Sequence, residues 1–358
     1  MSSDLAARRA AVLGPNVPTF YETPVHLVKG KGVWVWDSDG RKYLDCYNNV
    51  PHVGHCHPHV VTAIATQAAK LNTHTRYLHV GIVEYCERLT AKFQTQLDQV
   101  IMVCSGSEAN DIALRMAQAV TGKTGIIATD NTYHGNTMAV SHLSSRKPPI
   151  GGYASNIRHI SAPDTLRPVG GTADGQAVAF AQELQTAIDD LESAGHGFSG
   201  FICCPTFANE GLPDLPQDFM KPAEQVVKAA GGVLIVDEVQ PGFGRGGETW
   251  WGHEWLGISP DVVTLGKPMA NGHPVAAVVA RAEIMAEFRN AFGYFNTFGG
   301  NPVSCAAAAA TLDVIEQENL VDHAKNVGAV FLHELHSIDH PSIASRRGRG
   351  LFFALELE

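Results

Sequence analysis

The sequence of 358 residues lacks several features that would assign it at once to a broad class. It has no apolar run long enough to cross a bilayer, which excludes a helical membrane span. It contains no internal repeat and no low-complexity tract, which excludes a repeat array and a compositionally disordered chain. The opening stretch "MSSDLAARRAAVLG" has the pattern of a short amphipathic helix and lacks the apolar run of a signal peptide.

Positive charge is in deficit, because 26 Lys and Arg against 36 Asp and Glu give a formal net charge of −10. This balance argues against nucleic acid or an anionic membrane surface as the main partner, although a local pocket can still accept a small anion. Cysteine is sparse and irregularly spaced, and its count of seven is odd. Since a chain of this size does not need disulfides, the cysteines predict reduced thiols and a cytoplasmic location.

From about residue 60, short apolar segments alternate with helical patterns. Residues 83–97, "VEYCERLTAKFQTQL", are an expected helix, and "PVSCAAAAATLDVIEQENLV" is expected to start a long one. The expected strands are "QVIMVCSG", "TGIIATD", "GFICC", "GVLIVDE", "PDVVTLG" and "PVAAVVA", with "GLFFALELE" at the end of the chain. Before them, residues 33–36 and 42–45 are expected to pair as a hairpin around "DSDG". This alternation predicts an α/β sheet that is largely parallel and buried on both faces.

Ligands of such sheets bind at the carboxyl ends of the strands, so residues that follow a strand indicate where chemistry occurs. "VLIVDEVQ" ends in Asp237, "QVIMVCSGSEAN" runs through Ser107 into a helix, and "VVTLG" is followed by Lys267. Each residue also has an ordinary explanation. Asp237 could cap a turn, the serine could be a helix N-cap, and the lysine could extend to solvent or form an ion pair.

Taken together, the three strand ends match the needs of one cofactor. Backbone N–H groups at a helix start can hold a phosphate, a carboxylate can pair with a pyridinium nitrogen, and a lysine can form a Schiff base. These are the groups that pyridoxal phosphate requires. The glycine-containing turn is neither a Walker A loop nor a GxGxxG motif, so the sequence gives no support for a nucleotide site.

At this point the sequence resembles the class III pyridoxal phosphate-dependent aminotransferases, from about residue 18 to its end. The motifs "SGSEAN", "TYHG", "VDEVQPGFGR", "TLGKPMANG" and "NTFGGNPVSCAAA" occur in the family's order. The resemblance implies fold type I, with a large domain and a smaller α+β domain built from both chain ends. The expected boundaries are 1–58 for the N-terminal part of the small domain, 59–312 for the large domain and 313–358 for the start of the C-terminal part.

The resemblance also implies roles around the cofactor ring. Tyr133 is expected to stack on the pyridine ring with His134 beside it, and Asp237 to pair with the ring nitrogen. Gln240 is expected to contact the ring hydroxyl. Lys267 is expected to be the Schiff-base lysine and the group that moves protons.

The cofactor phosphate is expected to bind at Gly106 and Ser107. Thr297 is expected to reach the phosphate of a neighbouring subunit. The resemblance therefore implies a homodimer with shared active sites, and whether dimers pair further stays open.

Within the class, "YNNVPHVGHCHPHV" and "LNTHTRYLHVGIVEYCERL" resemble the phospho-lyases that act on ethanolamine phosphate and phosphohydroxylysine. This likeness implies elimination of phosphate from a phosphorylated amine, with aldehyde and ammonia as the other products. Such a reaction needs a second anion site, for which Arg76 is the candidate because a guanidinium suits phosphate. Asn48 and Asn49 could line the same pocket, and an exposed or structural role is the alternative for Arg76.

Two departures from the family pattern bear on this interpretation. Many class III aminotransferases carry a Glu-Pro pair, part of a gate for dicarboxylate acceptors, where this chain has Cys204 and Pro205, with Glu210 further along. The departure puts transamination of 2-oxoglutarate in doubt without excluding pyruvate. The chain also ends at "GLFFALELE", before the segment with which the family completes its small domain, so site residues from that segment are expected to be missing.

Several other functions compete with the phospho-lyase as interpretations of the sequence. A class III aminotransferase that uses pyruvate or another keto acid is the main alternative, and a racemase or mutase on the same fold matches the sequence less well. A regulator that binds the cofactor without catalysis would need a DNA-binding segment or altered catalytic residues, and neither is seen. Histidines crowd around Cys56 in "HVGHCHPHV", but their spacing matches no standard zinc pattern, so no metal is expected.

Overall fold

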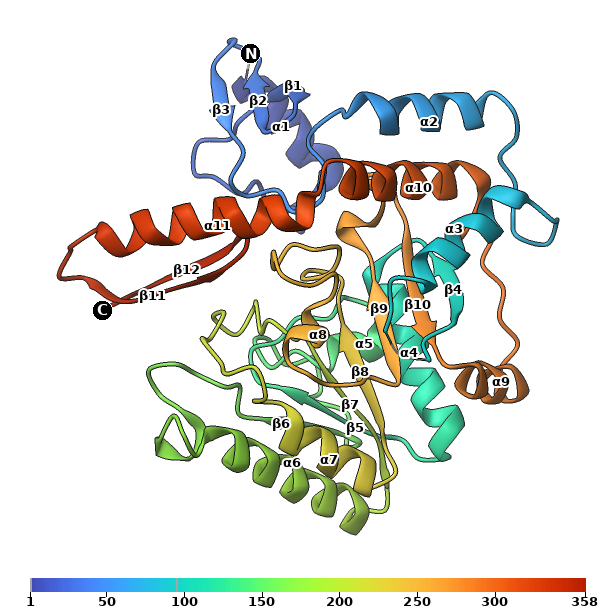
Figure 1. Ribbon diagram of the computed structural model, residues 1–358, viewed down its shortest axis with the longest axis vertical. Helices are drawn as coiled ribbons and strands as arrows, with labels where there is room; N and C mark the ends of the chain where they lie inside the picture. Colours follow the sequence, from blue (N-terminus) through green and yellow to red (C-terminus); the bar gives the residue numbers. More distant parts are fainter. Residues whose placement is uncertain (1, 95) are drawn as a thin grey trace.

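The computed structural model describes residues 2–94 and 96–358. At its centre lies a seven-stranded sheet in the order β4-β10-β9-β8-β7-β5-β6 (Figure 1). Its strands are β4 (Gln99–Val103), β5 (Gly125–Thr129), β6 (Ile157–Ile160), β7 (Phe198–Cys203), β8 (Val233–Asp237), β9 (Val262–Leu265) and β10 (Ala276–Ala280). Strands β5 to β9 are mutually parallel where they pair, whereas β10 is antiparallel to both of its neighbours. The predicted fold class is confirmed.

Helices precede, follow and separate these strands. They are α1 (Ser2–Leu13), α2 (Pro58–Ala68), α3 (Val80–Thr90), α4 (Gly106–Thr121), α5 (Met138–Ser141), α6 (Gln176–Ser193), α7 (Lys221–Ala229), α8 (Gly252–Trp255), α9 (Ala282–Ala291), α10 (Pro302–Gln317) and α11 (Leu320–Ser337), with short 3-10 turns η1 (Val169–Gly171) and η2 (Lys267–Ala270). Within the described residues, none of these helices is both long and apolar enough to cross a membrane.

Strands β5 and β7 to β10 are buried along their whole length, which explains their continuous apolar runs, whereas the edge strands β4 and β6 are buried in part. Along β8, Val233 and Ile235 pack into one hydrophobic cluster with residues of α4, while Leu234 and Val236 pack into another with α6 and α7. Successive side chains of a strand point to opposite faces, so α4 covers one face and the pair α6 and α7 covers the other.

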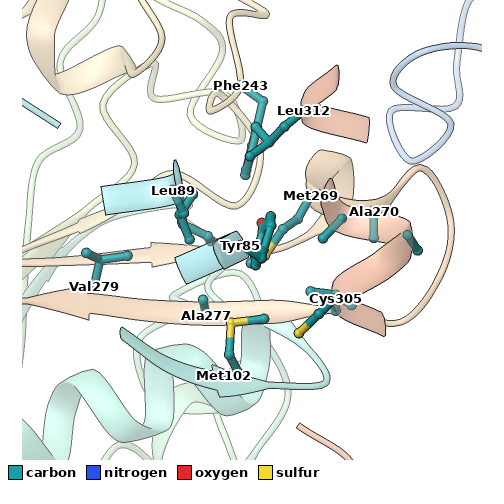
Figure 2. Packing of buried hydrophobic residues seen from close by; sticks show 14 of the residues in the cluster. Tyr85, Leu89, Met102, Phe243, Met269, Ala270, Ala277, Val279, Cys305 and Leu312 are labelled. Carbon is teal, nitrogen blue, oxygen red and sulfur yellow. The ribbon is translucent and has the colours of Figure 1, made fainter. Parts of the chain in front are cut away.

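A third hydrophobic cluster packs against the edge of the sheet that contains β4 and β10 (Figure 2). Tyr85 and Leu89 from α3 pack there against Cys305 and Leu312 from α10, and all four are buried. Helix α10 also lies along α2 (Figure 1). These contacts fix the N-terminal segments against the helix that follows the large sheet.

Two small sheets lie outside the central one. Strands β1 (Leu27–Lys31), β2 (Trp34–Asp37) and β3 (Lys42–Leu44) form an antiparallel sheet, which confirms the predicted hairpin. Strands β11 (Ile343–Arg349) and β12 (Phe352–Leu357) pair antiparallel near the end of the chain beside α11 (Figure 1). The domain boundaries at residues 58 and 312 stay a prediction.

Three details differ from the sequence-based expectations. The helix expected over 83–97 ends at Thr90 as part of α3, and residue 95 of that stretch lies outside the described residues. The long helix expected from residue 302 is two helices, because Asn319 adopts a left-handed backbone with φ of +49° between α10 and α11. Strand β11 carries three arginines and no apolar alternation, so nothing local indicated it.

Helix α6 has one buried face and one exposed face, which leads to a stability prediction. Leu184 is fully buried against the sheet, whereas Val178 on the same helix is 65% exposed. We expect Leu184→Ala to lower the free energy of unfolding by about 2–5 kcal/mol, because it leaves a cavity in a packed cluster. Val178→Ala should change it by no more than about 0.5 kcal/mol. Denaturant unfolding measures both, and equal losses would contradict the assigned orientation of α6.

Candidate active site

The three strand ends singled out in the sequence meet at one edge of the sheet. They surround a cavity of about 160 Å³ beside the start of α4. Its lining is Gly106, Ser107, Tyr133, His134, Gly135, Cys204, Asn209, Asp237, Val239, Gln240 and Lys267. Seven residues of the expected cofactor set therefore lie around one space, although they come from four separate segments of the chain.

The start of α4 offers backbone N–H groups to this cavity. Ser105 caps the helix, since its side chain accepts a hydrogen bond from the backbone N–H of Glu108 at 3.2 Å. The ordinary N-cap and the anion cradle are thus compatible, because capping leaves other N–H groups of the first turn free for an anion. The Ser107 hydroxyl accepts from the backbone N–H of Asn136 at 3.2 Å, which ties the loop after β5 to the cradle.

Glycines allow the walls of the cradle to approach one another. A Cβ on Gly106 would lie 2.8 Å from a methyl carbon of Val239. A Cβ on Gly266 would lie 3.5 Å from the backbone nitrogen of Gly106. A side chain at position 106 would displace Val239, whereas one at position 266 would make only an ordinary or slightly tight contact, so the close approach of the start of α4 to the turn after β8 depends on Gly106.

Asp237 is 5% exposed, and both oxygens of its carboxylate accept hydrogen bonds. Its Oδ1 accepts from the backbone N–H of Val239 at 3.0 Å. Its Oδ2 accepts from Asn110 Nδ2 at 2.8 Å and lies 2.7 Å from His134 Nδ1. The Thr264 hydroxyl orients Asn110 by donating to its Oδ1 at 2.6 Å. A buried carboxylate held in place by these donors is suited to pair with a cationic ring nitrogen.

Lys267 occupies the turn that follows β9. Its φ of +30° lies in the left-handed region, which is unfavourable for a residue with a side chain. Strain of this kind persists where the surrounding structure fixes the backbone, and it concentrates at functional sites. The turn is held because β9 and β10 pair directly on either side of it.

Tyr133, Gln240 and Cys204 complete the wall. Tyr133 lines the cavity and is 48% exposed, so its side chain is accessible to a ring bound there. The backbone oxygen of Gln240 accepts from Arg245 Nε at 3.1 Å, which fixes the loop after β8. Burial raises the pKa of the Cys204 thiol to about 12, so this position contributes a neutral group.

Arg76, Thr297 and Asn48 do not line this cavity. The Arg76 guanidinium lies 4.0 Å above the ring of Phe295, two residues before Thr297. The Asn48 side chain donates to Asp45 Oδ2 at 2.9 Å. Their expected roles stay predictions, and Arg76 and Thr297 lie close to one another on segments outside this cavity.

Sequence reasoning missed the residues that hold Asp237. Asn110 is buried on α4 and Thr264 is buried in β9. A polar residue inside an otherwise apolar strand or helix face is the only local signal of either one. That signal does not identify the partner: Asn110 donates to Asp237, which lies 127 residues away in the sequence.

The histidines around Cys56 do not converge on a common point. His52 hydrogen-bonds the backbone oxygen of Phe243, while three others face separate carboxylates: His55 with Asp45, His57 with Glu318, and His59 with Asp313. Over residues 2–94 and 96–358, no group of three or more His, Cys, Asp or Glu side chains could hold a metal ion.

The residues around the cavity fit pyridoxal phosphate. The α4 N-terminus and Ser107 can hold its phosphate, Asp237 its ring nitrogen, and Lys267 its aldehyde. Tyr133 and Gln240 lie in the wall between these groups. The aromatic residue, the carboxylate, the lysine and the anion cradle are thus all present in one cavity, as the cofactor requires.

Gly135 provides a test of this fit. Its φ is +138°, and a Cβ there would lie 2.7 Å from Ser107 Cα. We expect Gly135→Ala to displace Ser107 and weaken binding of pyridoxal phosphate by about 5- to 150-fold, since local strain of about 1–3 kcal/mol falls on the bound state. Equilibrium titration followed by the cofactor's absorbance measures the change.

Gly152→Ala is the matched control. Gly152 also has a positive φ, +90°, but a Cβ there would have nothing within 4 Å. Its substitution adds comparable backbone strain away from the cavity, so cofactor affinity should not change. Equal weakening by both variants would show that Gly135 acts through general stability rather than through the cradle.

Known proteins resemble this chain over nearly its whole length. Residues 18–358 match the family described as aminotransferase class-III. A Drosophila melanogaster protein named alanine–glyoxylate aminotransferase 2-like is 39% identical over 360 residues, 96% of this chain and 72% of that protein. A Caenorhabditis elegans protein named ethanolamine-phosphate phospho-lyase homolog 1 is 34% identical, over 99% of this chain and 79% of its own length.

Solved structures also resemble this chain in sequence and fold. A phospholyase from Arthrobacter in complex with phosphoethanolamine is 43% identical, with a TM-score of 0.94 over 99% of this chain and 84% of that one. An omega-transaminase from Thermomicrobium roseum is 28% identical, with a TM-score of 0.88 over 100% of this chain and 84% of that one. On the geometry of its cavity and this match over residues 18–358, the chain belongs to the class III aminotransferase family and its cofactor is pyridoxal phosphate.

Proposed function

We propose that this chain is a phospho-lyase that eliminates phosphate from a phosphorylated amine such as O-phosphoethanolamine, giving aldehyde, ammonia and phosphate. The observation that carries the proposal is the likeness to the Arthrobacter phospholyase, which was solved with phosphoethanolamine and shares 43% identity over 99% of this chain. The segments around Asn48 and Arg76, which resemble this branch of the family, lie within the matched region.

The cavity residues have distinct tasks in this reaction. Gly106 and Ser107 hold the cofactor phosphate, and Asp237 keeps the proton on the ring nitrogen. When bound, pyridoxal phosphate supplies an electron sink for the substrate carbon that bears nitrogen. Lys267 Nζ takes the proton from that carbon, and the bond from the adjacent carbon to the phosphate oxygen breaks. Hydrolysis then yields acetaldehyde and ammonia, so no keto acid is consumed.

Cys204 supports an elimination over transamination of dicarboxylates. It lines the cavity at the position that matches the glutamate of many class III aminotransferases. Its thiol is uncharged at neutral pH, because burial raises its pKa to about 12. A neutral group cannot form the charged gate that accommodates dicarboxylate acceptors.

We further propose a homodimer in which Arg76 and Thr297 serve the cavity of the partner subunit. Neither residue lines the cavity of its own chain, and the stacking of Arg76 on Phe295 places the guanidinium next to the Thr297 segment. Large apolar side chains are exposed beside both segments, with Leu78 103% and Phe298 70% exposed. An interface that covers these side chains would bring the arginine toward a substrate phosphate.

Transamination to pyruvate or another keto acid is the alternative. It is favoured by the relatives named as aminotransferases, among them the Drosophila protein at 39% identity. The cavity residues serve both reactions, since Lys267 and Asp237 have the same tasks in each.

The two reactions differ in their products. With pyridoxal phosphate-loaded enzyme, O-phosphoethanolamine and no keto acid, we expect continuous release of phosphate with equal amounts of ammonia and acetaldehyde. Colorimetric phosphate and enzymatic aldehyde assays measure this. If the substrate instead reacts once without releasing phosphate, and the cofactor's absorbance recovers only after pyruvate is added, the enzyme is an aminotransferase.

Mixed dimers test the position of Arg76. Lys267→Ala and Arg76→Ala variants should each lose most of the release from O-phosphoethanolamine. If Arg76 acts across the interface, a dimer of one Lys267→Ala chain and one Arg76→Ala chain has one intact site. About half of randomly assembled dimers are of this kind, so about a quarter of all sites should be active. Activity that never exceeds the sum of the two separate variants would exclude action of Arg76 in the partner's cavity.

A further inference from the structure

Glu108, in the first turn of α4, joins two distant segments of the chain with one carboxylate. Its Oε2 accepts a hydrogen bond from the backbone N–H of Cys104 at 2.9 Å, where β4 leads into the phosphate cradle. Its Oε1 accepts a hydrogen bond from Nδ2 of Asn296, which lies 188 residues further along the sequence. Neither side chain has a task in the reaction described above.

The ordinary explanation of Glu108 accounts for only one of these contacts. A carboxylate in the first turn of a helix stabilises that helix, and the contact with the backbone of Cys104 belongs to the helix start, like the cap from Ser105. A helix start does not require the second oxygen to reach another segment. The contact with Asn296 therefore indicates a task beyond the helix itself.

Asn296 shapes the turn that follows it. Its Oδ1 accepts from the backbone N–H of Phe298 at 3.0 Å and from that of Gly299 at 2.6 Å. Its Nδ2 donates to Glu108, and a carboxylate can only accept. Glu108 therefore determines which way the amide of Asn296 faces, and so keeps its oxygen directed at the turn.

The segment around Asn296 is held at both ends by its own chain, whereas its middle is exposed. At one end the ring of Tyr294 packs against Phe288 of α9, with ring centroids 6.3 Å apart. At the other end a Cβ on Gly299 would lie 2.3 Å from the backbone oxygen of Met102 in β4. Between them Thr297 is exposed, and this is the residue expected to reach the cofactor phosphate of the neighbouring subunit.

We propose that Glu108 is a positioning residue for the cavity of the partner subunit. Through Asn296 it holds the turn that presents Thr297 to the cofactor phosphate bound by the other chain. The inference rests on the homodimer proposed above and extends it, because one carboxylate serves both the cradle of its own chain and the phosphate site of its neighbour. Each cavity of the dimer then depends on the first turn of α4 in both chains.

The amide in Glu108→Gln cannot replace the carboxylate at both contacts, because it has one oxygen and its nitrogen only donates. The backbone N–H of Cys104 is fixed and takes the oxygen, so the side chain of Asn296 must turn and release the N–H groups that it holds. Within its own chain, the substitution also removes a negative charge one residue from Ser107, which favours a bound phosphate. The two cavities should therefore respond in opposite directions.

Mixed dimers separate these two effects. Two chains with different affinity tags are purified as mixed dimers, and one of them carries Lys267→Ala. Only the other, reporting chain can give the absorbance of cofactor joined to the lysine, so titration with pyridoxal phosphate measures one defined cavity. With Glu108→Gln on the Lys267→Ala chain, we expect the reporting cavity to bind at least about fivefold more weakly. With Glu108→Gln on the reporting chain, affinity should stay the same or increase.

An exchange of the two polar groups provides the matched rescue. When Glu108→Gln is combined with Asn296→Asp on the Lys267→Ala chain, the new amide accepts from Cys104 and donates to the new carboxylate. That carboxylate still accepts from the N–H groups of the turn. The net charge is that of the wild type, and affinity should return to within about twofold of it. Asn296→Asp alone should weaken binding, since two carboxylates then face one another.

Thr297→Ala on the Lys267→Ala chain tests the shared cavity itself. It should weaken binding by the reporting chain, and adding Glu108→Gln to the same chain should then change little, because both act through one contact. If Thr297→Ala acts across the interface and Glu108→Gln does not, or if the exchange gives no rescue, the inference alone is overturned.

The absence of any effect of Thr297→Ala across the interface would overturn the shared cavity and the inference together. Weakening only when Glu108→Gln is on the reporting chain would confine its task to its own cradle and likewise overturn the inference. These readouts follow cofactor affinity and need no substrate, so the phospho-lyase proposal is decided separately by its phosphate release.

Discussion

Burial of the Asp237 carboxylate at the end of β8 is the constraint on which the rest of the site depends. A charge removed from water needs donors, and Asn110, His134 and the backbone of Val239 supply them. Each donor comes from a different element: α4, the loop after β5, and the turn after β8 itself. Satisfying this one group therefore holds in place the same elements that carry the phosphate cradle and Tyr133.

The sequence predicted the parts of the site that follow from local pattern. A run of buried aliphatics followed by Asp237 or Lys267 predicts both a strand and an unusual residue at its end. The central sheet was confirmed, with Asp237 as the last residue of β8 and Lys267 in the turn after β9. Family motifs extended this to Tyr133 and Gln240, and both line the cavity. Their roles toward the ring stay predictions, since proximity alone does not assign them.

What the sequence could not provide are interactions between distant segments. The hydrogen bond from Thr264 to Asn110 joins residues 154 positions apart, and neither residue indicates the other. Strand β11 was missed for a similar reason, because Arg347 is buried only through contacts with Glu356 and with backbone oxygens of residues 211 and 212. Tertiary partners there outweigh a local pattern that is polar and lacks alternation.

The antiparallel placement of β10 determines when the site can form during synthesis. Residues 276–280 pair with 99–103 on one side and with 262–265 on the other, so β10 joins the phosphate cradle to the strand that carries Lys267. A growing chain therefore makes β10 after both of the strands that it joins. Until then α4 can pack against β7, β8 and β9, but the strand that links β4 to them is missing, so the sheet edge beside the cradle is completed only when β10 pairs.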